Sequence, residues 1–126
     1  MDVLIVERDE LLGTVLADAL VEDGISAAVM PDEEALALPP DQAALVVITG
    51  MNRGHTEDLA GMTLGRCMRK KWPTLCIVYL ASLWPARLAR NVLTAGDRFL
   101  AKPVALTQLV RTVQQLIASG MCRQPG

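Results

Sequence analysis

The sequence predicts an α/β fold in which a parallel β-sheet is covered by helices on both faces. Short apolar runs alternate with segments of helical periodicity along the whole chain, and the connections between them are short. Such alternation favours parallel strands joined by right-handed crossovers. The composition agrees with this fold class, because 52% of the residues are hydrophobic and only 3% are aromatic. Aliphatic side chains suit strands that are buried on both faces.

Five apolar runs are the predicted strands, and they cover residues 3–6, 25–30, 45–48, 75–80 and 99–101. The run Leu45–Ile48 is the clearest, because consecutive aliphatic residues are typical of a buried strand. Helical periodicity follows every run. It predicts helices between Asp9 and Gly24, after Pro31, over about 58–71, from Pro85 to Gly96 and over 106–117, with a polar loop at 50–57.

Residue types at the helix ends support this assignment. Asp9 is a predicted cap, because its carboxylate can accept a hydrogen bond from a free amide of the first turn. Pro31 and the acidic residues 32–34 favour a helix start, since proline fits the first turn and acids favour the positive end of the helix dipole. The basic residues that end the third helix are expected to be solvated, and they are Arg66, Arg69, Lys70 and Lys71.

The chain has 126 residues and no linker or repeat, which indicates one domain, predicted over residues 1–120, with a flexible tail at 121–126. A net charge of −2 gives no general attraction to nucleic acid. The longest uncharged stretch, residues 72–86, contains two prolines and is too short to span a bilayer. No secretory signal is recognised at the N-terminus, so a cytoplasmic location is expected.

The cysteines and the histidine give no sign of a metal site. Cys67, Cys76 and Cys122 show no C-x-x-C spacing, and His55 is the single histidine. A zinc site cannot be assembled from this pattern. Reduced thiols in a cytoplasmic protein are therefore the expected state of all three cysteines.

Segments at the ends of two predicted strands resemble bacterial response-regulator receiver domains. Residues 3–10 join a strand to an acidic turn, and residues 96–103 form a strand that ends in Lys102-Pro103. Residues 61–66 and Trp72-Pro73 are similar to the third helix of that family and its run into the fourth strand. The resemblance covers essentially the whole chain. It implies a flavodoxin-like (βα)₅ fold with five parallel strands in the order found in receivers.

Receivers bind Mg²⁺ with an acidic pair after the first strand and accept a phosphoryl group on an aspartate after the third. They also carry a threonine or serine after the fourth strand, an aromatic residue within the fifth, and Lys-Pro at its end. The resemblance implies that the corresponding positions here are Glu7, Arg8, Thr49, Ala81, Phe99, Lys102 and Pro103. Arg8, Thr49 and Ala81 depart from the family pattern. The pocket is therefore predicted to be a degenerate phosphorylation site with no catalytic residue.

Each departure changes the chemistry that is expected at this pocket. Arg8 replaces a carboxylate, so Mg²⁺ binding is expected to be lost or weak. Arg8 is either a solvated turn residue or the partner of Glu7 in a pocket-filling salt bridge. Thr49 cannot form an acyl phosphate, and Ala81 has no hydroxyl to hold a phosphoryl group. Lys102 is expected to pair with Glu7, and the resemblance implies a cis peptide bond before Pro103.

A tryptophan and several arginines form a candidate interface. They are Trp84, Arg87, Arg90, Arg98 and Arg111. They fall on the predicted fourth helix, fifth strand and last helix, which the resemblance implies is a face used for dimerisation or partner binding. Arginine and tryptophan are also enriched at interfaces. The alternatives are scattered surface charge for the arginines and a cover over the vacated pocket for Trp84.

These observations predict a stand-alone pseudo-receiver that is not an enzyme, needs no cofactor and binds neither nucleic acid nor membrane. It is expected to contact a histidine kinase, a regulator or a second copy of itself. Two alternatives remain open. One is a conventional phosphorelay receiver with a displaced acceptor, such as Asp58 or Asp41. The other is a sensor of a small anion or metabolite at the strand-end pocket of Glu7, Arg8, Thr49 and Lys102.

Overall fold

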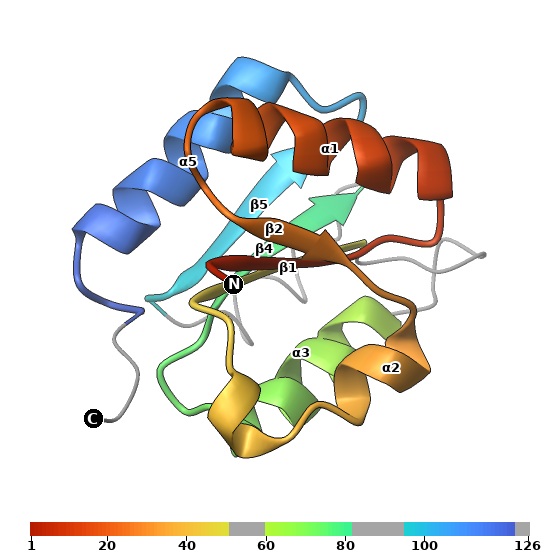
Figure 1. Cartoon of the computed structure of the whole chain (residues 1–126), viewed down its shortest axis with the longest axis vertical. Helices are drawn as coiled ribbons and strands as arrows, with labels where there is room; N and C mark the ends of the chain where they lie inside the picture. The colour runs from red at the N-terminus through yellow and green to blue at the C-terminus, as the bar shows by residue number, and fades with distance from the viewer. Residues whose placement is uncertain (51–59, 82–94, 123–126) are drawn as a thin grey trace.

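The computed structural model describes residues 1–50, 60–81 and 95–122, with the side chains of residues 60 and 61 left undescribed. A five-stranded parallel sheet in the order β2-β1-β3-β4-β5 lies between two layers of helices (Figure 1). The strands are β1 (Val3–Val6), β2 (Ala27–Val29), β3 (Val46–Gly50), β4 (Cys76–Ala81) and β5 (Asp97–Ala101). The helices are α1 (Glu10–Glu22), α2 (Asp32–Leu36), α3 (Ala60–Lys71) and α5 (Leu106–Ala118), with a short 3₁₀ turn, η1 (Pro40–Gln42). The predicted fold class is confirmed.

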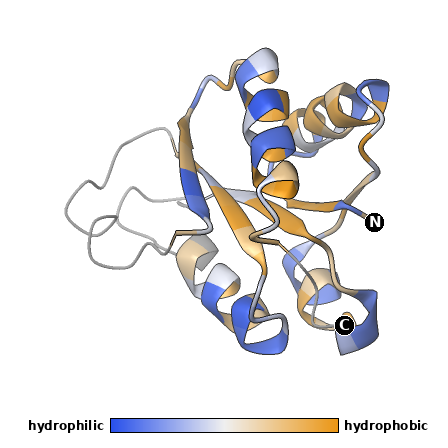
Figure 2. Cartoon of the chain, turned by 90° about the vertical axis from the view of Figure 1, so that its left-hand side faces the viewer, coloured by the Kyte–Doolittle hydropathy of each residue, from blue (hydrophilic) through white to orange (hydrophobic). Residues whose placement is uncertain are grey.

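Each face of the sheet has its own core. Helices α1 and α5 cover one face, and α2 and α3 cover the other (Figure 1). β1, β3 and β4 are buried along their whole length, which explains their continuous apolar sequences. Figure 2 shows these strands as mostly hydrophobic, whereas the helices carry polar residues as well. None of the described helices has both the length and the apolar character needed to cross a bilayer.

Helix α1 begins and ends where the sequence predicts. The Leu12 amide donates a hydrogen bond of 3.1 Å to Asp9 Oδ1, which confirms the predicted cap. Gly24 follows the helix with φ = +81°, a left-handed conformation that favours glycine. The apolar stripe of this helix is wider than its buried face. Leu11 is 76% exposed and Val15 is also exposed, while Leu16 and Leu20 are fully buried.

The basic end of α3 is less solvated than predicted. The Arg69 guanidinium forms an ion pair with Asp97 at 2.5 Å and donates two hydrogen bonds to Leu75 O. Lys71 Nζ donates hydrogen bonds of 2.7 and 2.6 Å to the carbonyl oxygens of Leu36 and Leu38. These cations therefore connect α3 to the start of β5 and to the end of α2.

The prediction of three reduced thiols is wrong for two of the cysteines. Cys76, at the start of β4, and Cys122, after α5, form a disulfide across 46 residues of sequence. Gly120 (φ = +77°) turns the chain back after α5, so that Cys122 enters the core beneath that helix. The folded part thus extends past the predicted boundary at residue 120. Cys67 is a free, exposed thiol on α3.

Candidate functional site

The carboxyl ends of the strands bring most of the predicted pocket residues to one edge of the sheet. The register places Thr49 beside Val6 on one side and beside Tyr79 on the other. Tyr79 in turn lies beside Phe99. Because Glu7 follows β1 and Lys102 follows β5, both side chains reach the same edge as Thr49.

Glu7 is the buried charge at the centre of this edge. Its residue is 9% exposed, and its Oε1 atom lies 3.3 Å from Lys102 Nζ. Oε1 also accepts a hydrogen bond of 3.3 Å from the Asp9 amide. Within the described part of the chain, Oε2 is buried and has no hydrogen-bond partner. The ion pair expected between Glu7 and Lys102 is present, and the Lys102-Pro103 peptide bond is cis, as the resemblance implied.

Gly50 makes room for the Glu7 carboxylate. A Cβ atom on Gly50 would lie 3.1 Å from Glu7 Oε2, which is tighter than most real contacts of a Cβ atom. The glycine at the end of β3 therefore lets the carboxylate fold over the strand. Sequence reasoning assigned Gly50 to a loop and missed this role. The available signal was a glycine directly after a buried aliphatic strand.

Arg8 is exposed in the turn between β1 and α1. Among the residues that the structure describes, the ion-pair partner of Glu7 is Lys102, and Arg8 forms no ion pair. Of the two alternatives left open by the sequence, the arrangement corresponds to the solvated turn residue. The positive charge that neutralises Glu7 thus comes from the far edge strand rather than from the adjacent residue.

Thr49 and Ala81 occupy buried positions at the ends of β3 and β4. Thr49 is fully buried, and its hydroxyl donates a hydrogen bond of 3.3 Å to Gly50 O. Ala81 is 4% exposed and pairs with Ala101 of β5. Its carbonyl oxygen accepts a hydrogen bond of 2.9 Å from the Lys102 amide. This backbone bond helps to hold the lysine at the end of the sheet.

Tyr79 is a polar residue of this region that sequence reasoning missed. Its ring lies 5.5 Å from that of Phe99, centroid to centroid, with the ring planes tilted by 31°. Burial, reinforced by the nearby Asp97 carboxylate, raises the pKa of Tyr79 to about 12. Tyr79 is the single tyrosine of the chain, which was the available signal. The phenol that is absent at position 99 is present in the neighbouring strand.

The candidate interface is described only in part. Arg98 on β5 and Arg111 on α5 are exposed. Arg98 Nη1 also donates hydrogen bonds of 2.7 Å to Ala95 O and 2.8 Å to Asp97 O, so this side chain lies along the start of its strand. The other candidates, which are Trp84, Arg87 and Arg90, lie outside the described residues.

The residues described at this edge do not fit the oxygen cage that Mg²⁺ requires. Glu7 contributes one unpartnered carboxylate oxygen, with the Lys102 ammonium group beside the other. The Asp9 carboxylate caps α1, and no group of three or more metal-ligating side chains occurs in the described part of the chain. Mg²⁺ prefers octahedral coordination by several oxygen atoms.

The fold is that of response-regulator receiver domains. A receiver protein from Sinorhizobium medicae matches with a TM-score of 0.77 and 22% identity, over 93% of this chain and 94% of that one. The receiver domain of the Francisella response regulator 1452 matches with a TM-score of 0.76 and 22% identity, over 93% and 96%. A response regulator from Thermotoga maritima matches with a TM-score of 0.77 and 21% identity, over 92% and 96%. No protein-family model and no curated protein matches the chain.

Proposed function

We propose that this protein is a pseudo-receiver of bacterial two-component regulation, which acts by protein–protein contact and not by aspartyl phosphorylation. One observation carries the proposal. Thr49, which we infer to stand at the phosphoacceptor position, is fully buried and hydrogen-bonded to Gly50, and Lys102 is already paired with Glu7. A lysine that would face a phosphorylated aspartate in receivers here pairs with the Glu7 carboxylate.

The chemistry of phosphoryl transfer is poorly supported by these residues. Alcohol oxygens need a general base for activation, and the Glu7 carboxylate is held in an ion pair instead. Charge developing on a transferred phosphoryl group needs metal ions and donors that are positioned in advance. With Arg8 turned to solvent and no second carboxylate in the described pocket, we expect Mg²⁺ to bind weakly or not at all.

A receiver fold without phosphorylation can act through its surface alone. The exposed Arg98 and Arg111 lie on β5 and α5, on the face that we propose for a partner. The partner would be a histidine kinase, a regulator or a second copy of this chain, in the cytoplasm. Arginine suits such contacts because its planar guanidinium binds carboxylates and stacks on aromatic rings.

The intact mass of the protein after incubation with acetyl phosphate and Mg²⁺ tests the proposal. We expect no gain of a phosphoryl group, because no described residue can replace the acceptor aspartate. The matched control is the triple variant Arg8→Asp, Thr49→Asp and Ala81→Thr, which restores the residue types of receivers at the three positions that depart from the family pattern. This variant is expected to gain one phosphoryl group with Mg²⁺. A stoichiometric gain by the wild-type protein would refute the proposal, and peptide mapping would then locate the acceptor.

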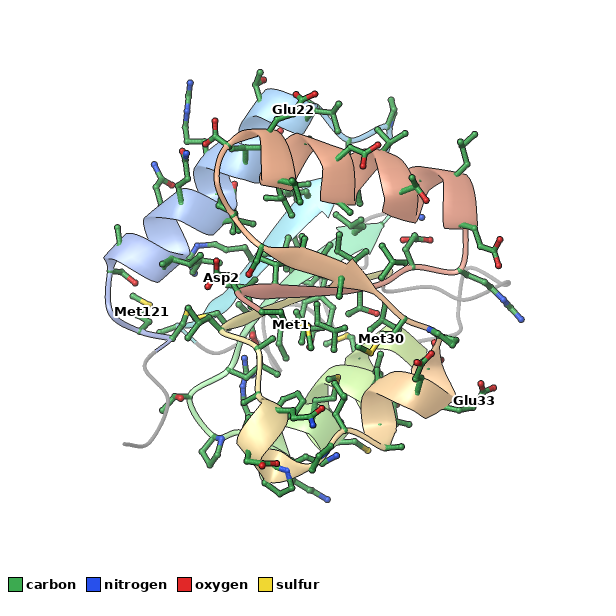
Figure 3. All side chains as sticks on the ribbon, in the orientation of Figure 1. Met1, Asp2, Glu22, Met30, Glu33 and Met121 are labelled. Atoms are coloured by element: carbon green, nitrogen blue, oxygen red, sulfur yellow. A yellow bond between two sulfur atoms is a disulfide. The ribbon has the colours of Figure 1, made fainter. Side chains whose placement is uncertain are left out.

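The displaced-acceptor alternative has little support from the described residues. Asp41 lies in η1 and lines a depression with Met1 and Asp2. Met1 and Asp2 precede β1 (Figure 3), whereas Lys102 follows β5, so in this parallel sheet the depression lies at the opposite end from Lys102. Asp58 lies outside the described residues. An acceptor on Asp41 would therefore lack the lysine that accompanies phosphorylation in receivers.

One observation favours the small-ligand alternative as a second candidate. Glu7 Oε2 is buried and unpartnered in the described structure, and such an atom gains from a hydrogen-bond donor. The sequence left open a small anion or a metabolite, and this atom favours a metabolite that carries an amine, amide or hydroxyl group. A thermal-shift comparison of amine-bearing metabolites with small anions would separate the two, because a ligand that binds the folded state raises Tm.

A further inference from the structure

We propose that Cys76 and Cys122 are a reversible thiol–disulfide pair, whose redox state fastens or releases the chain end of α5. This inference goes beyond the proposed function and does not depend on it. The Cα atoms of the two residues are 5.5 Å apart, a separation typical of disulfides, although 46 residues of sequence divide them. Both residues are buried, with 1% and 3% exposure.

The two ends of this bond are held very differently. Cys76 belongs to β4, which is hydrogen-bonded to β3 on one side and to β5 on the other. Cys122 follows a turn whose described backbone amide contacts are few and local. Gly120 N–H donates to Ile117 O at 3.3 Å, and Met121 N–H donates to Ser119 Oγ at 3.2 Å. Met121 is exposed beside the end of α5 (Figure 3).

This asymmetry provides a route for exchange with an external thiol. Segments with few buried contacts and weak hydrogen bonds open at low free energy, without unfolding of the rest of the domain. Opening of residues 119–121 uncovers the disulfide from the side of Cys122, while the bond itself and the sheet that carries Cys76 stay intact. We therefore assign the Cys122 sulfur as the one that an external thiol attacks.

The site also accommodates the reduced state. Cys122 Sγ lies 3.5 Å from Leu116 O, which is within reach of a weak hydrogen bond once the sulfur carries a proton. Cys76 Sγ packs against Gly96, where a Cβ atom would lie only 3.3 Å from it. The strand that carries Cys76 is held by its own hydrogen bonds to β3 and β5, so reduction can release Cys122 without a rearrangement of the sheet.

The disulfide between Cys76 and Cys122 forms in two exchange steps with a low-molecular-weight disulfide such as oxidised glutathione. One cysteine thiolate attacks the external disulfide, which forms a mixed disulfide and releases one glutathione thiolate. The second cysteine then attacks the protein sulfur of the mixed disulfide and releases the other glutathione. In total, two protein thiols are oxidised to one disulfide, and one glutathione disulfide is reduced to two thiols. Reduction follows the reverse path.

A thiol count across glutathione redox buffers tests reversibility. The full chain is equilibrated at increasing ratios of reduced to oxidised glutathione, quenched with acid, alkylated under denaturing conditions and weighed intact. Cys67 is free in both states, so we expect one alkyl group on the oxidised protein and three on the reduced protein, in a single transition. The Cys67→Ser variant is the matched control, with zero and two groups and an unchanged midpoint.

Two results of that titration would overturn the proposal. If the wild-type protein keeps one alkylated cysteine at every glutathione ratio and opens only with dithiothreitol, the bond is a permanent structural disulfide. If it shows three alkylated cysteines at every ratio, the pair does not form. Either result leaves the pseudo-receiver proposal untouched, because that proposal is tested by the phosphoryl mass gain.

Brief hydrogen–deuterium labelling tests the release of the chain end. Reduction is expected to increase deuterium uptake at residues 119–122 by on the order of tenfold, while the amides of β1 stay protected in both states. The Cys122→Ser variant should match the reduced wild-type protein in either buffer. Equal uptake at 119–122 in both states would overturn the release, and so would loss of protection in β1, because reduction would then unfold the domain.

Discussion

Glu7 shows how a single buried carboxylate sets the character of the pocket. Its side chain is 4% exposed, and the ammonium group of Lys102 is the charge that offsets its removal from water. The lysine side chain is itself 26% exposed, so the pair is screened in part by solvent. Loss of the Lys102 charge is therefore expected to destabilise the fold more than loss of the Glu7 charge, because the buried carboxylate would remain without a charged partner whereas the lysine can be solvated.

This dependence predicts an asymmetric pair of variants. Lys102→Met leaves the Glu7 carboxylate without its cation, and we expect the free energy of unfolding to fall by about 1–3 kcal/mol. Glu7→Gln removes the charge and should recover most of this loss in the Lys102→Met background. Urea unfolding of the wild-type protein, both single variants and the double variant measures the coupling. Additive single effects would show that the ion pair contributes no net interaction.

Tyr79 gives the protein a characteristic response to high pH. Its pKa is raised from 10.0 to about 12 in the folded state, first by burial and second by Asp97. The unfolded state loses the phenol proton at lower pH than the folded state, so folding stability from this group is present below pH 10 and is lost as the pH rises toward 12.

An alkaline titration checks this prediction. Because Tyr79 is the single tyrosine, its phenolate absorbance reports this side chain alone, and we expect a midpoint near 12. The Tyr79→Phe variant should lose less stability between pH 10 and 12 than the wild-type protein does. Lysine deprotonation affects both proteins and cancels in the comparison. A phenolate midpoint at the ordinary value of about 10 would contradict the prediction.

At the scale of elements, α3 approaches β4 closely because Gly65 carries no side chain. A Cβ atom at this position would lie 2.5 Å from the Tyr79 phenol oxygen and 2.9 Å from Ile77 Cδ1. Alanine ordinarily stabilises a helix interior by about 1 kcal/mol relative to glycine. Here the contact with the phenol oxygen outweighs that gain, because Tyr79 is buried and cannot move aside freely.

A double-variant comparison tests this packing. Gly65→Ala is expected to destabilise the wild-type protein by about 1–3 kcal/mol, since overpacked cores shift side chains and backbone. In the Tyr79→Phe background the phenol oxygen is gone, so the same substitution should cost less, although the close approach to Ile77 Cδ1 remains. Thermal unfolding of the four proteins supplies the measurement. If Gly65→Ala destabilised both backgrounds equally, the steric clash would involve atoms other than the Tyr79 phenol oxygen.

The elements that sequence reasoning predicted well are those whose causes are local. β1 and β3 are continuous aliphatic runs, and Asp9 and Gly24 mark the ends of α1. The features it missed join residues that are distant in the chain. Neither the contact of Gly65 with Tyr79 nor the ion pair of Arg69 with Asp97 leaves a periodic pattern in either segment. Both arise from the crossing of elements, which local propensity does not encode.

At the scale of the whole molecule, the disulfide is the longest-range covalent constraint that the structure describes. In the chain-entropy account, closure of a loop of this length lowers the entropy of the unfolded state and stabilises the fold by about 4 kcal/mol. We therefore expect the Cys122→Ser variant to lose up to about 4 kcal/mol of unfolding free energy under oxidising conditions and little under reducing conditions. Urea unfolding in both buffers measures this difference, and Cys67→Ser is the control.

The site depends on the same long-range organisation. Glu7, Thr49 and Lys102 belong to three segments of the sequence, and their meeting was predictable because parallel strands end at one edge of a sheet. The ion pair of Lys102 with Glu7 was predicted from the sequence. Whether Arg8 also pairs with Glu7 was left open, since that depends on where the Arg8 side chain lies in the turn. The sequence thus predicts which strands end side by side better than it predicts which side chains at those ends contact each other.

The bond between Cys76 and Cys122 also makes a covalent ring of the last part of the chain. All five candidate interface residues, from Trp84 to Arg111, belong to the ring in sequence. A single cut by a protease anywhere between residues 76 and 122 would open the ring but leave the two fragments attached to each other. An oxidised, nicked molecule would keep its proposed partner-binding segment, whereas a reduced one would hold it by non-covalent contacts alone.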